Sequence, residues 1–254
     1  MKIKIIFPIF AVIFLSSCLF NEDKPRIAVN RGLSPQAMFK EAEAQLDAGA
    51  IDEALKLFND VQAAYPSSKY AIQAKLEIIY TLFKRSRHSE ALLELDEYID
   101  LYPSHLTTPY AYYLRGLIAE DKSKSILDNF ITDNSQRDVS SVVTALNNYL
   151  DLIKKYPESK YSEEAKEKLV ILRNVLARHE LFVAIFYTKK EAFIAAINRC
   201  KYIIEKFPNT PSVPAALHLI AHNYDKIDAP ILAKDARRVL KASYPKYIPH
   251  YTLD

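Results

Sequence analysis

The sequence predicts an all-α protein built as a superhelical array of about five helical hairpins. Only three glycines occur in 254 residues, which is far too few for a turn-rich β protein. After the amino-terminal 33 residues, an aromatic residue followed by proline recurs five times, at 65–66, 102–103, 156–157, 207–208 and 244–245. The residue twelve positions before each proline is always alanine: Ala54, Ala91, Ala145, Ala196 and Ala233. Five units in the same register, ending near residues 66, 103, 157, 208 and 245, predict a repeat array over residues 34–254.

The first 17 residues have the pattern of a signal peptide. Lys2 and Lys4 precede an apolar run over residues 5–15, which is too short to cross a bilayer because a helix needs about 20 apolar residues to do so. The run ends in Leu-Ser-Ser-Cys at 15–18, which resembles the bacterial lipobox. This resemblance implies that Cys18 becomes the first mature residue and carries covalent lipid, and no other cofactor is expected. The alternative is a plain secretory signal followed by an unmodified cysteine.

A lipid on Cys18 would attach the protein to a membrane, since each buried methylene adds roughly 0.8 kcal/mol of membrane affinity. Residue 19 is leucine, whereas an aspartate there tends to signal retention at the inner membrane. The resemblance therefore implies the periplasmic face of the outer membrane. Residues 18–33 contain Pro25 and several charges without a helical period, so we expect a flexible tether. Cys200 has no evident partner, and no structural disulfide is expected.

The first hairpin is predicted to begin at Ser34. This side chain can cap a helix, and the following Pro35 is tolerated because the first helical N–H has no partner inside the helix. The first helix reaches about Asp47, Gly49 ends it, and a second helix begins near Asp52.

The second helix of each unit resembles that of the tetratricopeptide repeat, which reads Ala-x3-Phe and then, eight residues later, Pro. Phe58 and Tyr149 keep the aromatic residue, while Leu95 and Cys200 replace it with smaller apolar groups. Arg237 breaks the pattern in the last unit, where a more polar outer face is expected. Eight residues after each proline the next helix carries alanine, which supports an unbroken stack: Ala74, Ala111, Ala165 and Ala216.

Two units contain extra chain, because the proline intervals are 37, 54, 51 and 37 residues against a consensus period of about 34. Before Pro157 the excess is the polar stretch 120–138, which predicts an inserted loop. Before Pro208 the excess predicts a long helix over about 162–180. Thr188-Lys-Lys-Glu191 then has the capping-box pattern and predicts that the next helix begins there.

No motif for catalysis, nucleotide binding or metal binding is recognised. Three glycines cannot supply a phosphate-binding loop or a Gly-x-Ser-x-Gly turn. His218 and His222 share one helical face but lack a third and fourth ligand, so packed or solvated histidines are expected. After removal of Lys2 and Lys4, 32 basic residues face 31 acidic ones, and there is no basic run to bind nucleic acid.

The most specific stretch is 176–199, which reads LARHELFVAIFYTKKEAFIAAINR. With the lipobox and the repeats, it resembles the BamD (YfiO/ComL) family, lipoproteins of the outer-membrane β-barrel assembly machinery. Tyr110-x-x-x-Leu-Arg-Gly116, Tyr156-Pro-x-Ser-x-Tyr161 and the Arg137-Asp138 pair also match family positions. The resemblance spans essentially the whole mature chain.

This resemblance implies a non-catalytic subunit that binds the periplasmic domains of the BamA-like barrel-forming subunit, largely through its carboxy-terminal repeats. It also implies help in delivering and inserting unfolded outer-membrane proteins, which the amino-terminal repeats meet, and accessory lipoproteins as further partners. Tyr187, Asn198 and Arg199 are expected to face the partner, with helix capping and internal ion pairs as their alternative roles. Two other functions stay open: a different periplasmic repeat lipoprotein acting as an envelope or cell-wall adaptor, and a peptidoglycan hydrolase, for which the repeats leave no separate catalytic domain.

Overall fold

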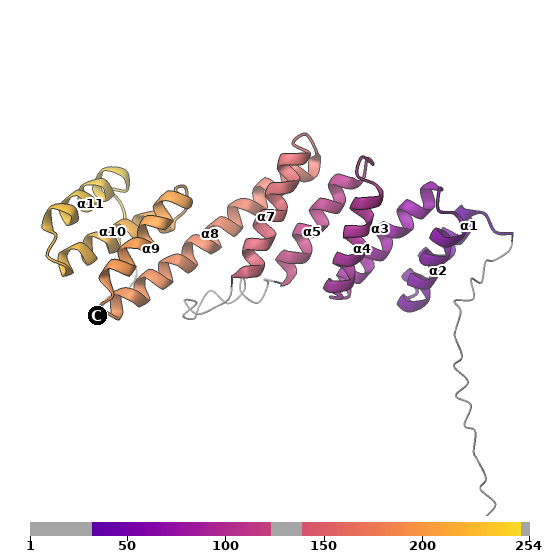
Figure 1. Ribbon diagram of the computed structural model, residues 1–254, viewed down its shortest axis with the longest axis horizontal. Helices are drawn as coiled ribbons and strands as arrows, with labels where there is room; N and C mark the ends of the chain where they lie inside the picture. Colours follow the sequence, from indigo (N-terminus) through magenta and orange to yellow (C-terminus); the bar gives the residue numbers. More distant parts are fainter. Residues whose placement is uncertain (1–31, 123–138, 250–254) are drawn as a thin grey trace, which may run out of the picture.

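The computed structural model describes residues 32–122 and 139–249, and every regular element within them is a helix (Figure 1). In chain order these are α1 (Pro35–Asp47), α2 (Ile51–Ala64), α3 (Lys69–Lys84), α4 (His88–Leu101), α5 (Thr108–Lys122), α7 (Ser140–Lys155), α8 (Lys160–Lys189), α9 (Phe193–Lys206), α10 (Ser212–Lys226) and α11 (Pro230–Ser243). The all-α prediction is confirmed. Cys18 lies outside the described residues, and so does the predicted tether except for residues 32 and 33.

Consecutive helices pair as hairpins, and the hairpins follow one another along the longest axis of the molecule (Figure 1). The first helices of successive hairpins also contact one another, in the order α1, α3, α5, α8 and α10. Contacts between the second helices of successive hairpins are weaker in the described part of the chain. The first helices therefore form the inner layer of the array, and the second helices form the outer layer.

The repeated small and aromatic residues mark the sites where helices pack. All five alanines of the second helices are fully buried, and so are the four alanines of the following helices. Four residues after the second-helix alanine, Phe58, Leu95, Tyr149 and Cys200 are also fully buried. Arg237 takes this position in α11, where it forms an ion pair with Asp225 of α10 at 2.6 Å. The pattern thus identifies core positions in four hairpins and a polar contact in the last one.

The turns inside the hairpins share one left-handed residue, seventeen positions before the proline. Gly49 has φ +79°, and the equivalent Ser86, Glu191 and Asp228 have φ between 55° and 57°. In each turn the following N–H donates at 2.9 Å to a carbonyl five residues earlier: Ala50 to Gln45, Arg87 to Leu82, Ala192 to Tyr187 and Ala229 to Tyr224. These bonds satisfy carbonyls at the end of the first helix.

The prediction that a helix begins at Thr188 is wrong. Thr188 lies in the last turn of α8, where its hydroxyl donates to the carbonyl of Ala184 at 3.0 Å. The buried side chain of Asn223 donates to the same hydroxyl at 2.9 Å. Because α10 and α8 thus use Thr188 as a buried contact, Glu191 takes the left-handed turn position and α9 begins only at Phe193.

The predicted boundaries of the extra segments also need correction. The long helix covers 160–189 instead of about 162–180, since the hairpin turn comes only after Lys189. The inserted loop was predicted from residue 120, but α5 continues to Lys122. The helix is held there because the Glu120 carboxylate accepts hydrogen bonds from Tyr149 at 2.8 Å and from Lys168 at 2.9 Å. The rest of the predicted loop, 123–138, lies outside the described residues.

The 30-residue helix α8 takes part in two neighbourhoods. Near its start, Tyr161 packs on Tyr110 and Tyr113 of α5, with ring centroids 5.2 and 5.5 Å apart. Near its end, Thr188 contacts Asn223 of α10. Figure 1 shows α8 running from α7 to α9 and α10. One continuous helix therefore connects the amino-terminal and carboxy-terminal parts of the array.

Candidate partner-binding surface

Arg199 lies on α9 and pairs with α8. Its guanidinium donates to the Glu180 carboxylate at 3.1 Å, and 46% of the Arg199 side chain stays exposed against 17% for Glu180. The ion pair orients the guanidinium while leaving much of it accessible. The geometry therefore suits both roles that the sequence left open, an internal ion pair and a contact with a partner.

Asn198 and Tyr187 lie in different surroundings. Asn198 is exposed beside Arg199 on α9, whereas Tyr187 is partly buried near the end of α8 and packs edge-on against Phe186 at 5.8 Å. Tyr187 comes seven residues after Glu180, which is about 10 Å along a helix. The structure thus brings Asn198 and Arg199 together and leaves Tyr187 nearer the hairpin turn, where its carbonyl closes the turn.

Two exposed apolar residues lie beside Asn198 and Arg199 on α9, and the sequence analysis did not identify them as candidate partner contacts. Ile194 and Tyr202 are 58% and 42% exposed, and they flank Asn198 at intervals of four residues, so the three side chains share one face of α9. Their four-residue spacing could have indicated a shared helix face, but the same spacing is equally typical of a buried stripe. We call Ile194, Asn198, Arg199 and Tyr202 the α9 surface.

The inner layer holds a groove at the amino-terminal end, with a volume of about 460 Å³. Side chains of α1, α3, α5 and the residue before α5 line it: Phe39, Glu43, Gln73, Leu76, Glu77, Tyr80, Thr107 and Tyr110. Burial and the nearby Glu43 raise the pKa of Glu77. Burial, helped by Tyr80, Tyr161 and Glu77, raises the pKa of Tyr110 to about 12. The groove combines aromatic walls with two carboxylates, a combination suited to an extended peptide segment.

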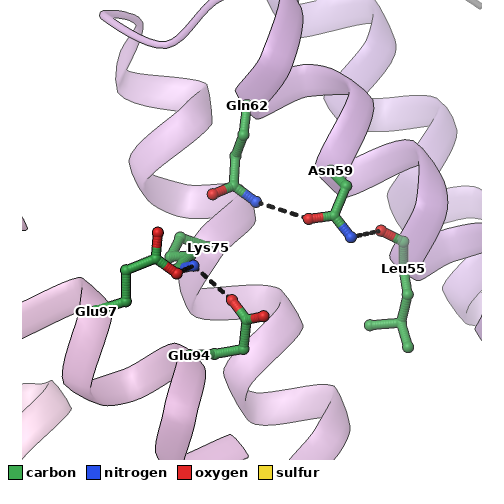
Figure 2. A network of polar contacts seen from close by, with 6 residues as sticks. All are labelled: Leu55, Asn59, Gln62, Lys75, Glu94 and Glu97. Atoms are coloured by element: carbon green, nitrogen blue, oxygen red, sulfur yellow. Dashed lines mark hydrogen bonds and ion pairs between the residues drawn. The ribbon is translucent and has the colours of Figure 1, made fainter. Parts of the chain in front are cut away.

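A polar cluster joins α3 to α4 close to this end. Lys75 is buried, with 7% of its side chain exposed, and its ammonium donates to Glu94 and Glu97 (Figure 2). Burial alone would lower the pKa of Lys75, but the hydrogen bonds that its ammonium donates to both glutamates, with their negative charges, outweigh burial, and the pKa lies above its ordinary value. A lysine held charged in this way is not a nucleophile, since that role needs a lowered pKa. The cluster therefore fixes helix packing.

His218 and Cys200, the histidine and cysteine considered in the sequence, take part in packing. Within residues 32–122 and 139–249, no group of three or more His, Cys, Asp or Glu side chains could hold a metal ion. His218 packs on Tyr247, with ring centroids 6.2 Å apart. Cys200 is fully buried, and burial raises the pKa of its thiol to about 12, which keeps it protonated and unreactive. No described helix is long and apolar enough to span a membrane.

Residues 31–240 match the family model described as YfiO, outer membrane lipoprotein. The chain belongs to this family. BamD of Neisseria gonorrhoeae, an outer membrane protein assembly factor, is 32% identical over 245 residues, which cover 96% of this chain and 92% of that protein. BamD of Xylella fastidiosa (strain Temecula1) is 30% identical, covering 85% of this chain and 74% of its own. The alignment with the crystal structure of MamA protein covers 85% of this chain and 97% of that chain, at 14% identity and with a TM-score of 0.34.

The family match confirms the resemblance found in the sequence and includes both surfaces described above. It spans the inner groove of α1, α3 and α5 as well as the α9 surface. Residues 241–249, which comprise the last turn of α11 and the chain after it, lie beyond the stretch that the family model matches.

Proposed function

We propose that this protein is a lipid-anchored, non-catalytic subunit of the outer-membrane β-barrel assembly machinery. In this role it binds the periplasmic domains of the barrel-forming subunit and helps deliver and insert unfolded barrel proteins, alongside accessory lipoproteins. The observation that carries the proposal is the family match over 31–240, supported by assembly-factor relatives that align along nearly the whole chain. The location proposed is the periplasmic face of the outer membrane.

The α9 surface is the proposed contact with the barrel-forming subunit. Tight interfaces combine exposed aromatic or aliphatic anchors with arginine, and Ile194, Tyr202 and Arg199 supply these types on one helix. Glu180 holds the Arg199 guanidinium in place before binding, which lowers the entropy cost of ordering it. Tyr187 is proposed to act at the edge of this contact, near the turn.

The inner groove of α1, α3 and α5 is the proposed contact with unfolded barrel segments. Unfolded strands are extended and alternate apolar with polar side chains. The aromatic walls of the groove, with Phe39, Tyr80 and Tyr110, would receive the apolar ones. Glu43 and Glu77 would favour segments that carry a lysine or arginine.

A charge swap distinguishes a partner contact at Arg199 from an internal role. Arg199→Glu alone removes the ion pair and places two carboxylates together, whereas Arg199→Glu combined with Glu180→Arg restores the pair in reverse. If the guanidinium contacts the partner, both variants should lose at least tenfold in affinity for the purified barrel-forming subunit in calorimetry. Recovery of affinity in the double variant would mean that Arg199 acts only inside the array. Arg87→Glu, which removes an exposed pair with Glu90 far from α9, is the matched control.

The lipid anchor is tested separately at Cys18. Cys18→Ser should release the protein into the soluble periplasmic fraction, because the array itself offers no membrane span among its described helices. Persistent attachment after extraction of bound partners would contradict lipidation of this residue.

The function as a whole is tested by depletion in the native cell. Loss of the protein should lower many outer-membrane barrel proteins together, measured by quantitative proteomics of envelopes. Affinity capture from solubilised envelopes should recover the barrel-forming subunit. Unchanged barrel levels with capture of cell-wall proteins would instead support the alternative, an envelope adaptor built on the same repeats.

A further inference from the structure

A second groove lies between the first two hairpins, where the end of α3 meets the turn that joins α1 to α2. Its volume is about 370 Å³. The side chains that line it come from the end of α1, the start of α2 and the end of α3: Leu46, Ile51, Tyr80, Thr81, Lys84 and Arg85. This turn groove is separate from the α9 surface, and Tyr80 is the one lining residue that it shares with the inner groove of α1, α3 and α5.

A buried hydroxyl in the wall of the turn groove has no hydrogen-bond partner. Thr81 is 4% exposed, and its Oγ1 forms no hydrogen bond with any of the residues that the structure describes. Two other helical threonines, Thr144 and Thr188, donate to the carbonyl four residues earlier at 2.9 and 3.0 Å. An unpaired buried hydroxyl is destabilising because it has lost its hydrogen bonds to water. A ligand group that accepts a hydrogen bond from Thr81 would remove this cost.

Two cationic side chains line the turn groove without an acidic partner. Lys84 and Arg85 are both exposed, and neither forms an ion pair within the described part of the chain. The acidic residues at the start of α2 have other partners: Asp52 lies 3.9 Å from Arg87, and Glu53 lies 3.6 Å from Lys56. The groove therefore presents two positive charges that no carboxylate neutralises.

The rest of the lining is apolar or aromatic. Leu46 and Ile51 are half-buried, and Tyr80 is 39% exposed. The ammonium of Lys84 lies 5.9 Å from the centroid of the Tyr80 ring, so the positive charge adjoins the apolar wall. The six lining residues include no carboxylate and no side-chain amide, so they offer few partners to the alternating donors and acceptors of a peptide backbone. A molecule with one anionic group and an apolar chain fits this lining better.

We propose that the turn groove binds an anionic phospholipid. The phosphate contacts Lys84 and Arg85, since cationic side chains form strong charge-assisted hydrogen bonds with phosphate oxygens. An ester carbonyl of the lipid accepts the hydrogen bond that Thr81 does not make within the protein. The first part of an acyl chain covers Leu46, Ile51 and the Tyr80 ring.

The bilayer is the source of this ligand, so the inference rests on the membrane location proposed above. It does not depend on the proposed part in barrel assembly. A lipid bound between the first two hairpins would hold the amino-terminal end of the array at the membrane surface by a contact distinct from the lipid on Cys18. Because binding is measured on the purified protein in vesicles, its failure would leave the depletion experiment, which tests barrel assembly, unaffected.

Photolabelling of the full-length, lipidated protein tests the site. The protein is incorporated into phosphatidylcholine vesicles that contain phosphatidylglycerol with a diazirine on one acyl chain, and labelled peptides are mapped by mass spectrometry. Labels are expected on the stretches 46–51 and 80–85, and the same probe with a phosphatidylcholine headgroup should label them much less. Labelling confined to residues near the anchor, equal labelling by both headgroups, or displacement of the probe by inorganic phosphate would each overturn the proposal.

Charge reversal at the groove distinguishes a site from general attraction to an anionic surface. Lys84→Glu and Arg85→Glu should each raise the probe content needed for half-maximal labelling by about fivefold, because each variant loses one contact with the phosphate. Lys69→Glu is the matched control, since it changes the charge equally at the other end of α3, where Lys69 lies 5.1 Å from the centroid of the Tyr70 ring. An equal rise in the control would contradict a specific site.

Thr81→Val separates a ligand contact from a structural role. The variant keeps the shape of the side chain and removes the hydroxyl, so half-maximal labelling should again need about fivefold more probe. Without anionic lipid the same variant should have a higher Tm than the wild-type protein, because the unpaired hydroxyl is gone. Unchanged labelling in Thr81→Val, whatever its Tm, would contradict the role proposed for this hydroxyl.

Discussion

The central junction of the array and its last hairpin are held together by different kinds of contact. Where α5 meets α7, Gly116 allows so close an approach that a Cβ there would lie 2.3 Å from the buried ring of Tyr149. In the last hairpin, α11 buries only Ala233 and Ala236 among its residues and relies on the exposed Arg237–Asp225 pair. A repeat packs only on its neighbours, so the centre gains contacts on two sides and the end on one. Stability should therefore decrease from the middle of the array to its last helix.

The largest effect is expected for Gly116→Ala. Alanine favours a helix by about 1 kcal/mol over glycine, but overpacking against a ring that cannot move typically costs about 1–3 kcal/mol and occasionally more. We expect a net loss of about 2 kcal/mol in the free energy of unfolding, measured by urea titration. In a Tyr149→Ala background the same substitution should become stabilising, because the space is then open. If Gly116→Ala alone unfolded at the same urea concentration as the wild-type protein, α5 and α7 would not pack closely at Gly116.

A smaller effect is expected for Tyr149→Phe at the same junction. The variant removes a hydrogen bond to the Glu120 carboxylate, and hydrogen bonds to charged groups contribute about 1.5–3 kcal/mol to stability. Because Lys168 still forms an ion pair with Glu120, we expect the free energy of unfolding to fall by only about 1 kcal/mol. Glu120→Gln supplies the second arm of a double-mutant cycle, and additive losses would show that the two groups do not interact.

Three tyrosines that are wholly or partly buried also predict an alkaline limit to stability. Burial raises the pKa of Tyr110 and of Tyr113 to about 12, and it raises the pKa of Tyr149 still further. Between about pH 10 and 12 the unfolded chain loses protons that the folded chain retains, so stability is full below pH 10 and falls as pH rises. Tm should drop by a few degrees between pH 9 and 11, and less in Tyr149→Phe. A Tm that is flat over this range would contradict the burial of these hydroxyls.

The smallest effect is expected at the end of the array. Arg237→Ala removes an exposed ion pair, and such pairs contribute about 0.2–1 kcal/mol. Urea unfolding of the whole protein should barely change, while hydrogen exchange in α11 should increase. High salt should produce the same local change in the wild-type protein. Faster exchange throughout α5 and α7 as well would show that the array unfolds as one unit and would remove the contrast between centre and end.

Core positions could be predicted from the sequence because helix periodicity determines them. The spacing of Ala54, Phe58 and Val61 identifies one stripe, and all three are fully buried. The hairpin turns could not be predicted in the same way. Ser86 and Glu191 adopt positive φ although their residue types rarely do, whereas Gly49 and, less strongly, Asp228 are of types found in the left-handed region.

The candidate surfaces depend on contacts between residues distant in sequence. Arg199 forms an ion pair with Glu180, nineteen residues earlier. This pairing depends on the register of α8 against α9, and the residue at which α8 ends determines that register. The end of α8 was misplaced because the contact between Thr188 and Asn223 of α10 is not visible in the local pattern. The side chains that line the inner groove likewise come from α1, α3 and α5, so no single stretch of the sequence predicts the groove.

Because α8 is one continuous helix, it determines the distance between the two parts of the array that it joins. At 1.5 Å per residue, its 30 residues form a rod of about 45 Å that packs on α5 and α7 at one end and on α9 and α10 at the other. A rod of hydrogen-bonded turns cannot shorten, so α8 keeps the helices packed at its two ends at a constant separation. A movement of α9 would therefore be transmitted along α8 to α5 and α7, and the number of residues in α8 determines the distance between these two regions.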